Sequence, residues 1–208
     1  MSEAAPAIDA NTAASARTTL GVPAATPGKP HLMVDLETFG TSAGCAIASI
    51  GAVVFDPVQG ALRETFYAVI DLGSCQEAGL TFEAGTVHWW LRQGDAARRA
   101  LTDAKTVTLS MALGQFRMFF LAHARRAPIW SHGANFDEPI LQAAFRAAHL
   151  PPPWDYWDAR CTRTLFALAG VRPDRAVGVH HNALDDAVNQ AEAVIEAYRI
   201  LGLGRRPI

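Results

Sequence analysis

The stretch His31–Glu37, HLMVDLE, begins the part of the chain in which regular secondary structure can be predicted. It is short, rich in apolar residues and follows a proline, as a buried strand would. Ala46–Phe55, AIASIGAVVF, is a longer run of the same kind, and we expect its internal Gly51 to lie at a β-bulge. Ala61–Ile70, ALRETFYAVI, follows a DPVQG turn and alternates enough to form a partner strand. Three successive strands with short links predict an antiparallel meander.

The hydrophobic period changes to that of helices after the third strand. Helices are predicted over residues 83–93, 109–126, 136–149, 159–170 and 183–201. Asp158 is the expected cap of the fourth helix. A short strand is expected within 127–133 and another within the PPPWDYWD stretch. The β-β-β-α-β-α order predicts an α/β fold, a mixed sheet flanked by helices, in one domain over residues 31–208.

The composition restricts the partners that the chain can have. The 208 residues carry a formal net charge of −2, so no bulk positive field attracts nucleic acid. Such a partner would need a local basic patch or bound metal ions. Three widely spaced cysteines favour a reducing, cytoplasmic location over a disulfide framework or a zinc site. No apolar run approaches the ~20 residues of a membrane span, and residues 1–30, rich in Ala, Pro, Thr and Ser, are predicted to be a disordered leader.

Two carboxylates in the first strand suggest a metal site. Asp35 and Glu37 are two residues apart, so their side chains emerge on the same face of the strand. A divalent cation such as Mg²⁺ or Mn²⁺ would relieve their mutual repulsion, although a strand end can also place acids in water. Asp137 is predicted in the first turn of a helix, where the helix dipole alone favours an acid.

The final helix distinguishes between two neighbouring aspartates. At about 100° per residue, Asp185 falls on a polar arc with Asn189, Glu192, Glu196 and Arg199, which we expect to be solvated. Asp186 falls between Ala193 and Ala197, outside that arc, so solvation does not explain it. His181 lies just before the helix, where a loop could direct its imidazole towards the same place.

Three segments together resemble the exonuclease motifs of the DnaQ-like superfamily, in the subgroup named for its Asp-Glu-Asp-Asp acids and a histidine. They are VDLETFG, GANFDEPIL and HNALDDA. His181 and Asp186 have the alanines that this subgroup places after its histidine and aspartate, whereas His180 and Asp185 do not. TVHWWLRQ and ARCTRTL, with WSHGANFDEPIL, are similar to the phage exonuclease and mycobacterial-type 3'-5' exoribonuclease branch. The resemblance implies a ribonuclease H-like fold.

The resemblance also implies the roles of individual residues. The catalytic residues would be Asp35, Glu37, Asp137, Asp186 and His181. The four acids would hold two divalent cations, Mg²⁺ or Mn²⁺, and His181 would take a proton from the attacking water. Thr38, Phe39, Asn135 and Arg163 would bind substrate, with Phe39 stacked on a base. Two positions depart from the family pattern: Gly133 stands where many members have Asn, and Cys161 stands where an acid is expected.

The activity implied is hydrolysis of single-stranded RNA or DNA, or of a 3' overhang, from the 3' end to nucleoside 5'-monophosphates. RNA and DNA stay open as alternatives because recognition of a 2'-hydroxyl needs only one or two side chains. A catalytically silent nucleic-acid-binding module is the alternative of another class. Arg160, Arg172 and Arg175 are further candidate phosphate contacts, with solvated surface charge as the alternative. Trp89 and Trp90 are expected to pack, with a homodimer interface as one place for them, and His132 is expected to have no role in the site.

Overall fold

The computed structural model describes residues 28–174 and 178–204 of the chain. The strands are β1 (His31–Thr38), β2 (Ile47–Asp56), β3 (Ala61–Ile70), β4 (Thr106–Val107), β5 (Ile129–Ser131) and β6 (Ala159–Cys161). The helices are α1 (Leu72–Glu77), α2 (Ala84–Leu91), α3 (Asp95–Thr102), α4 (Leu109–His123), α5 (Asp137–Ala147), the 3₁₀ turn η1 (Tyr156–Asp158), α6 (Thr162–Ala169) and α7 (Ala183–Leu201). The predicted leader falls almost wholly in residues 1–27, and the candidate Arg175 in 175–177; both lie outside the described residues.

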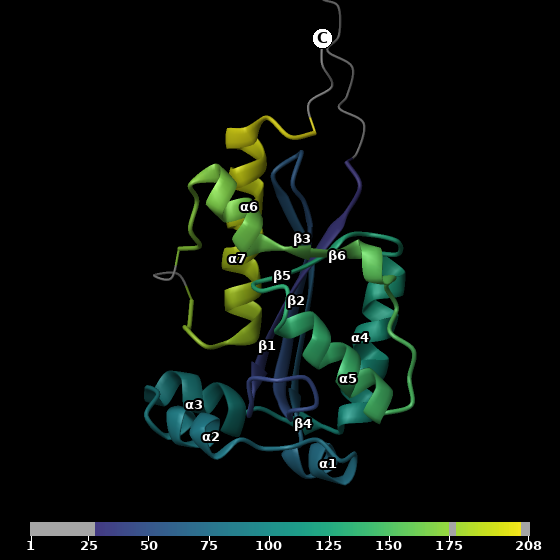
Figure 1. Ribbon diagram of the computed structural model, residues 1–208, viewed down its shortest axis with the longest axis vertical. Helices are drawn as coiled ribbons and strands as arrows, with labels where there is room; N and C mark the ends of the chain where they lie inside the picture. The colour runs from purple at the N-terminus through teal and green to yellow at the C-terminus, as the bar shows by residue number, and fades with distance from the viewer. Residues whose placement is uncertain (1–27, 175–177, 205–208) are drawn as a thin grey trace, which may run out of the picture.

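The sheet has the order β4-β3-β2-β1-β5-β6 (Figure 1). β1 and β3 each pair with β2 in antiparallel orientation, which confirms the predicted meander. β5 pairs with β1, β6 with β5 and β4 with β3, all in parallel. The sheet is therefore mixed, as predicted. Among residues 28–174 and 178–204, no helix combines the length and apolar character needed to cross a bilayer.

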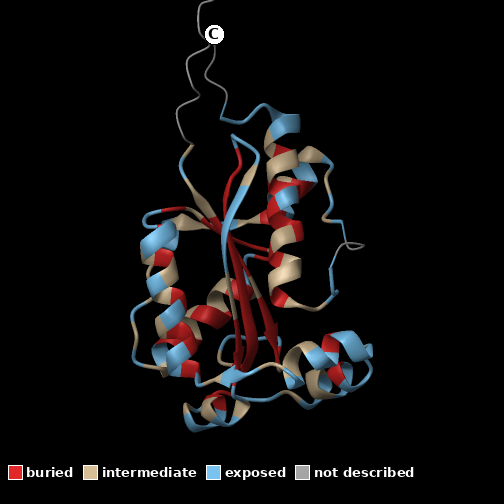
Figure 2. Ribbon diagram, turned by 180° about the vertical axis from the view of Figure 1, so that it is seen from behind, coloured by how far each residue is buried: buried red, intermediate tan, exposed pale blue. Residues whose placement is uncertain are grey.

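Helices cover both faces of the sheet, α4 and α5 one face and α6 and α7 the other (Figures 1 and 2). The alternating side chains of β1 contribute to both layers. Leu32, Val34 and Leu36 are buried in a cluster that includes Phe116 of α4. Met33 is buried instead with Phe166 of α6 and Ala187 of α7. Asp35 and Glu37 are in step with Met33, so the first-strand acids lie on the face that α7 covers.

Gly51 has a packing role that the sequence did not reveal. It was expected at a bulge, but the register shifts occur between Glu37 and Thr38 and between Val53 and Phe55. A Cβ atom at Gly51 would lie 2.1 Å from the backbone carbonyl carbon of Ala183. The glycine is therefore needed where the first turn of α7 meets the sheet, and it brings the start of this helix close to β1 and β2.

The segment before α6 differs from the prediction. Ala159–Cys161 forms β6 beside β5 instead of the first turn of a helix. α6 consequently begins at Thr162 with Cys161 at its N-cap, and Asp158 takes part in a capping box of η1. Pairing with β5 outweighs the local helical pattern here. The short elements α1, α3 and β4 were not predicted, whereas β3 and α7 have the predicted bounds.

Candidate active site

The acids of β1 lie at the carboxyl end of the strand and face α7. Glu37 is buried, and Asp35 is partly exposed to a cavity. Gln190 Nε2, on α7, donates a hydrogen bond to Asp35 Oδ1 at 2.7 Å. Gln190 Oε1 is also buried and has no hydrogen-bond partner among the residues that the structure describes. A buried acceptor without a partner would accept a hydrogen bond from a water molecule of a hydrated cation beside the carboxylate.

Asp137 comes to the same place from α5. It is the first residue of that helix and only 2 % exposed. Its Oδ1 accepts a hydrogen bond from the backbone N–H of Leu36 at 3.2 Å, between the two acids of β1. An acid that merely stabilised the helix dipole would have no reason to be buried against another strand. The structure thus favours the functional interpretation of Asp137.

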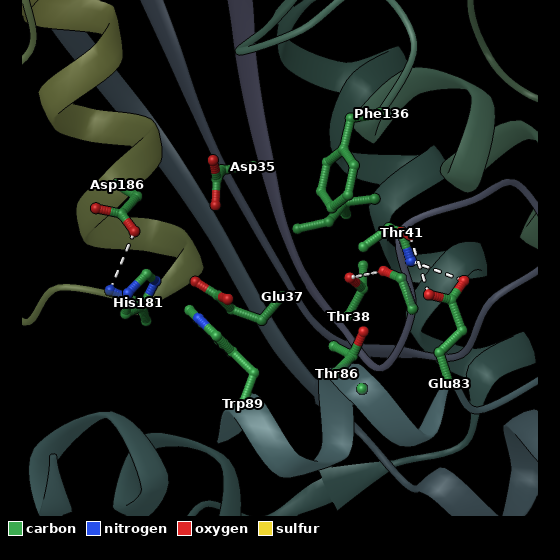
Figure 3. A pocket seen from close by; sticks show the side chains of 13 residues that line it. Asp35, Glu37, Thr38, Thr41, Glu83, Thr86, Trp89, Phe136, His181 and Asp186 are labelled. Carbon is green, nitrogen blue, oxygen red and sulfur yellow. Dashed lines mark hydrogen bonds between the residues drawn. The ribbon is translucent and has the colours of Figure 1, made fainter. Parts of the chain in front are cut away.

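The start of α7 supplies the remaining members of the site. Asn182 caps the helix, its side-chain oxygen accepting the N–H groups of Leu184 and Asp185. The backbone of His181 has a φ of 64°, in the left-handed region that is uncommon outside glycine. In this conformation its N–H donates to Asp186 Oδ2 at 3.1 Å (Figure 3). A residue held in this region is a candidate for a functional role.

Burial and repulsion disfavour the ionised forms of these acids. Burial raises the pKa of Glu37 to about 8, with further increases from Asp186 and Asp137. Burial, followed by the charges of Asp137 and Glu37, raises the pKa of Asp35 well above its usual range. Burial raises the pKa of Asp137 to about 7, although backbone hydrogen bonds and Arg163 oppose this increase. Bound divalent cations would offset this repulsion and favour the ionised forms.

The donor atoms fit hard cations. One ligand atom from each of Glu37, His181 and Asp186 lies within 4.8 Å of the other two. Carboxylate oxygens are the ligands that Mg²⁺ and Mn²⁺ prefer. The imidazole of His181 is thus as close to the Glu37 and Asp186 carboxylates as a third metal ligand would be. It could act either as a ligand or as a base.

Asp185 and Asn189 differ from Asp186 in what they contact. Asp185 Oδ2 accepts the backbone N–H of Val179 at 2.7 Å and so holds the loop before α7. Asn189 was expected on the solvated arc, but this prediction was wrong, because it is 6 % exposed and lines a cavity beside Gln190. A helical projection includes neither that loop nor the contact of α7 with α6.

A cavity of about 560 Å³ opens from the acids towards the loop after β1 (Figure 3). Besides the acids, its lining includes Thr38, Thr41, Glu83, Thr86, Trp89 and Phe136. Figure 3 shows Phe136 and Trp89 on opposite sides of the cavity, between the acids and Glu83. Glu83 accepts hydrogen bonds at 3.0 Å from Thr41 N, Thr41 Oγ1 and Ser42 Oγ, and so fixes the far end.

The predicted substrate contacts differ in whether they line a cavity beside the acids. Thr38 lines the large cavity, and Arg163 lines a second one, of about 230 Å³, beside Asp35 and Asp137. Asn135 is exposed and lines neither cavity. Phe39 was expected to stack on a base, but it lines neither cavity. Its ring packs instead near Phe82 and Trp90, at centroid distances of 5.7 and 6.2 Å. The register shift between Glu37 and Thr38 interrupts the alternation that would have placed Phe39 on the same face as Glu37.

Sequence reasoning missed several members of the site. Trp89 was expected to pack, but it is 41 % exposed, and its ring centroid is 4.7 Å from that of His181. Trp90 does pack: it is buried, and its Nε1 donates to Thr38 O at 2.9 Å. His132 lines the second cavity, contrary to the expectation that it had no role in the site. Only Gln190 gave a signal, since it lies one turn after Asp186 on the same helix face.

Comparisons with known proteins identify the family and the fold of the chain. Residues 30–198 match the family described as the 3'-5' exoribonuclease Rv2179c-like domain. No curated protein matches the chain. Among solved structures, the zinc-bound complex of E. coli exonuclease I with single-stranded DNA has a TM-score of 0.57 and 16% identity, over 85% of this chain and 41% of that one. Exonuclease I of E. coli with a dA16 oligonucleotide has a TM-score of 0.58 and 14% identity, over 84% and 42%.

Cell-death related nuclease 4 has a TM-score of 0.53 and 14% identity, over 86% of this chain and 65% of that one. At these identities the structural likeness shows a shared fold, a mixed sheet flanked by helices. The chain spans about two fifths of the length of exonuclease I.

Proposed function

The chain belongs to the 3'-5' exoribonuclease Rv2179c-like domain family, and from this premise we propose that it is a metal-dependent 3'-5' exonuclease of single-stranded nucleic acid. The observation that carries the proposal is the meeting of four carboxylates from β1, α5 and α7 at one end of a cavity, with an imidazole beside them. RNA is the first substrate to test, because the family is one of exoribonuclease domains. Single-stranded DNA and 3' overhangs are the others.

Asp35, Glu37, Asp137 and Asp186 would hold the cations. Glu37 and Asp186 present ligand atoms close together, and Asp35 interacts electrostatically with Asp137, Glu37 and Asp186. When bound, two divalent ions stabilise the attacking and the leaving oxygen of a phosphodiester. The protein holds the carboxylates in place through Gln190 on Asp35, Leu36 N–H on Asp137 and His181 N–H on Asp186.

His181 would accept the proton of the attacking water. Water adds to the phosphorus of the terminal linkage and the bond to the 3'-oxygen of the preceding nucleotide breaks. That oxygen takes up a proton from solvent to become the new 3'-hydroxyl, and a nucleoside 5'-monophosphate is released. An imidazole suits proton transfer near neutral pH. The contact of its ring with Trp89 and the hydrogen bond of its backbone to Asp186 would keep it directed towards the acids.

The large cavity would hold the terminal nucleoside. Trp89 and Phe136 flank it and offer aromatic surfaces to a base, and Thr38, Thr41 and Thr86 offer hydroxyl groups to the sugar or the base. Glu83 closes the far end through its bonds to the loop after β1. A pocket that ends there would admit one terminal nucleotide, as an exonuclease requires.

One assay tests the proposal. We would offer 5'-labelled single-stranded RNA, single-stranded DNA and a duplex with a 3' overhang, each with Mg²⁺, Mn²⁺ or a chelator. We expect metal-dependent shortening from the 3' end and release of nucleoside 5'-monophosphates. Asp186→Asn should remove the activity, whereas the exposed Glu192→Gln on the same helix should retain it. If no substrate shortens with either metal, the enzyme proposal is wrong. A homodimer and a cytoplasmic location remain predictions.

A further inference from the structure

A groove of about 880 Å³ lies beyond the second cavity, along α6 and the segment after it. It shares His132, Arg163 and Pro173 with the cavity that contains Asp35 and Asp137. The groove is thus continuous with the acids on the side away from Glu83. None of the eight described residues that line the groove is acidic, whereas two are arginines, Arg163 and Arg172.

Both arginines are available to an anion. Their side chains are exposed, and neither forms an ion pair with a carboxylate within the part of the chain that the structure describes. Arg160, by contrast, donates to the backbone oxygens of Trp157 and Ala159 and does not line the groove. Of the arginines around β6 and α6, two therefore face the groove and one is engaged with its own loop.

Gly133 lies against the guanidinium of Arg163. A Cβ atom at Gly133 would lie 3.5 Å from Arg163 Cζ and 3.7 Å from both terminal nitrogens. A side chain longer than one carbon atom at this position would compete with the guanidinium for space, and the φ of +146° at Gly133 itself favours glycine. Arg163 thus lies where the groove meets the acids.

The remaining lining suits a single strand. Phe166 forms part of the floor, and the ring of His132 lies over it at a centroid distance of 5.9 Å and an interplanar angle of 35°. His132 Nδ1 is held by the hydroxyl of Thr162 at 2.8 Å. A positively charged groove with a ring in its wall is the arrangement by which proteins bind single-stranded nucleic acid without reading its sequence.

We propose that this groove binds the phosphodiester backbone of the nucleotides on the 5' side of the scissile linkage, with Arg163 near the acids and Arg172 further along the strand. The direction rests on the proposed function: the terminal nucleoside occupies the cavity that Glu83 closes, so the rest of the strand must leave on the other side. Substrates long enough to reach Arg172 should therefore bind more tightly than dinucleotides.

The test separates Arg172 from the catalytic centre. Binding of 5'-fluorescein RNA, a dinucleotide and an oligomer of about eight nucleotides, would be followed by anisotropy in an Asp186→Asn background at several salt concentrations. Arg172→Gln should weaken oligomer binding by about 5-fold at 0.1 M salt and lower the salt slope by ~0.7, the single-strand value for one phosphate contact. Arg172→Lys should restore most of the loss, because it keeps the charge.

Arg125→Gln is the matched control, an exposed arginine at the opposite end of β5, and should bind like the parent. The ratio of kcat/KM for the oligomer to that for the dinucleotide should also fall in Arg172→Gln. An oligomer affinity unchanged from that of Arg125→Gln overturns the inference, as does an equal loss for the dinucleotide. If the wild type binds through Arg172 but cleaves nothing, the groove stands and the proposed function fails. If the protein cleaves both substrates and Arg172→Gln changes neither rate, the proposed function stands and the groove inference fails.

Discussion

Replacing Glu37 with Gln should make the metal-free protein more stable at pH 8 while changing it little at pH 5. The pKa of Glu37 rises from an ordinary 4.5 to about 8 in the folded protein because the carboxyl is buried beside Asp186 and Asp137. Between these values the unfolded chain has released the proton and the folded protein retains it. Stability therefore falls as pH rises from about 4.5 to 8, and the full benefit of the protonated form is present only below 4.5.

The size of the effect follows from the two pKa values. Their difference, about 3.5, corresponds to about 5 kcal/mol at 1.36 kcal/mol per pKa unit. About 3.5 kcal/mol of this develops between pH 5 and pH 8. In a protein of this size, 1 kcal/mol changes Tm by roughly 2–4 °C, so the wild type should lose roughly 7–14 °C more than Glu37→Gln over that interval.

The assay is thermal unfolding in the presence of a chelator, followed by circular dichroism from pH 5 to pH 8. Glu192→Gln removes an exposed carboxylate from the outer side of α7 and serves as the control. Its Tm should decline with pH in parallel with the wild type. If Glu37→Gln declines as steeply as these two proteins, Glu37 does not keep its proton in the fold, and the electrostatic basis of the proposed metal site is wrong. Adding Mg²⁺ should stabilise the wild type more at pH 8 than at pH 5, because binding requires the ionised acids.

Three further substitutions test the individual roles. Asp185→Asn should lower the initial rate on single-stranded RNA only mildly, since an amide oxygen can still accept the N–H of Val179. Asp186→Asn should abolish that activity. The reverse order would mean that the wrong aspartate was assigned. His181→Gln should lower kcat by about 10²-fold or more, yet Mg²⁺ should still raise the Tm of the variant. If Mg²⁺ no longer raises the Tm, His181 is a metal ligand instead of a base. Trp89→Ala should lower kcat/KM by roughly 5- to 150-fold, mostly through KM, because stacking of one base contributes about 1–3 kcal/mol. A change in kcat alone would instead mean that Trp89 supports the imidazole of His181.

The sequence predicted those elements whose signal is local. The alternation of β3 and the long apolar arc of α7 each extend over enough residues to define their ends. α1, α3 and β4 are too short for a period to emerge, and β6 was hidden in a helical pattern because its partner, β5, is about 30 residues earlier in the chain. The acids were predicted because hydrophobic surroundings make a carboxylate conspicuous. Trp89 was not, because an aromatic residue in a helix is most often part of a core.

The proposed choice of Asp186 over Asp185 depends on packing that no helical projection includes. Gly51 has no side chain, so Ala183 can lie directly on β2, and the next turn of α7 then carries Asp186 over the β1 face that displays Asp35 and Glu37. The left-handed turn at His181 brings the backbone N–H to Asp186 and leaves the imidazole beside Glu37. Asp185, one residue earlier, turns back to the N–H of Val179 and holds the loop that makes this turn. In the proposed site the two aspartates are complementary: Asp186 would supply a metal ligand, and Asp185 fixes the loop that carries His181. The tolerance expected of Asp185→Asn should therefore not extend to Asp185→Ala, which removes the acceptor and should lower the rate through the position of His181.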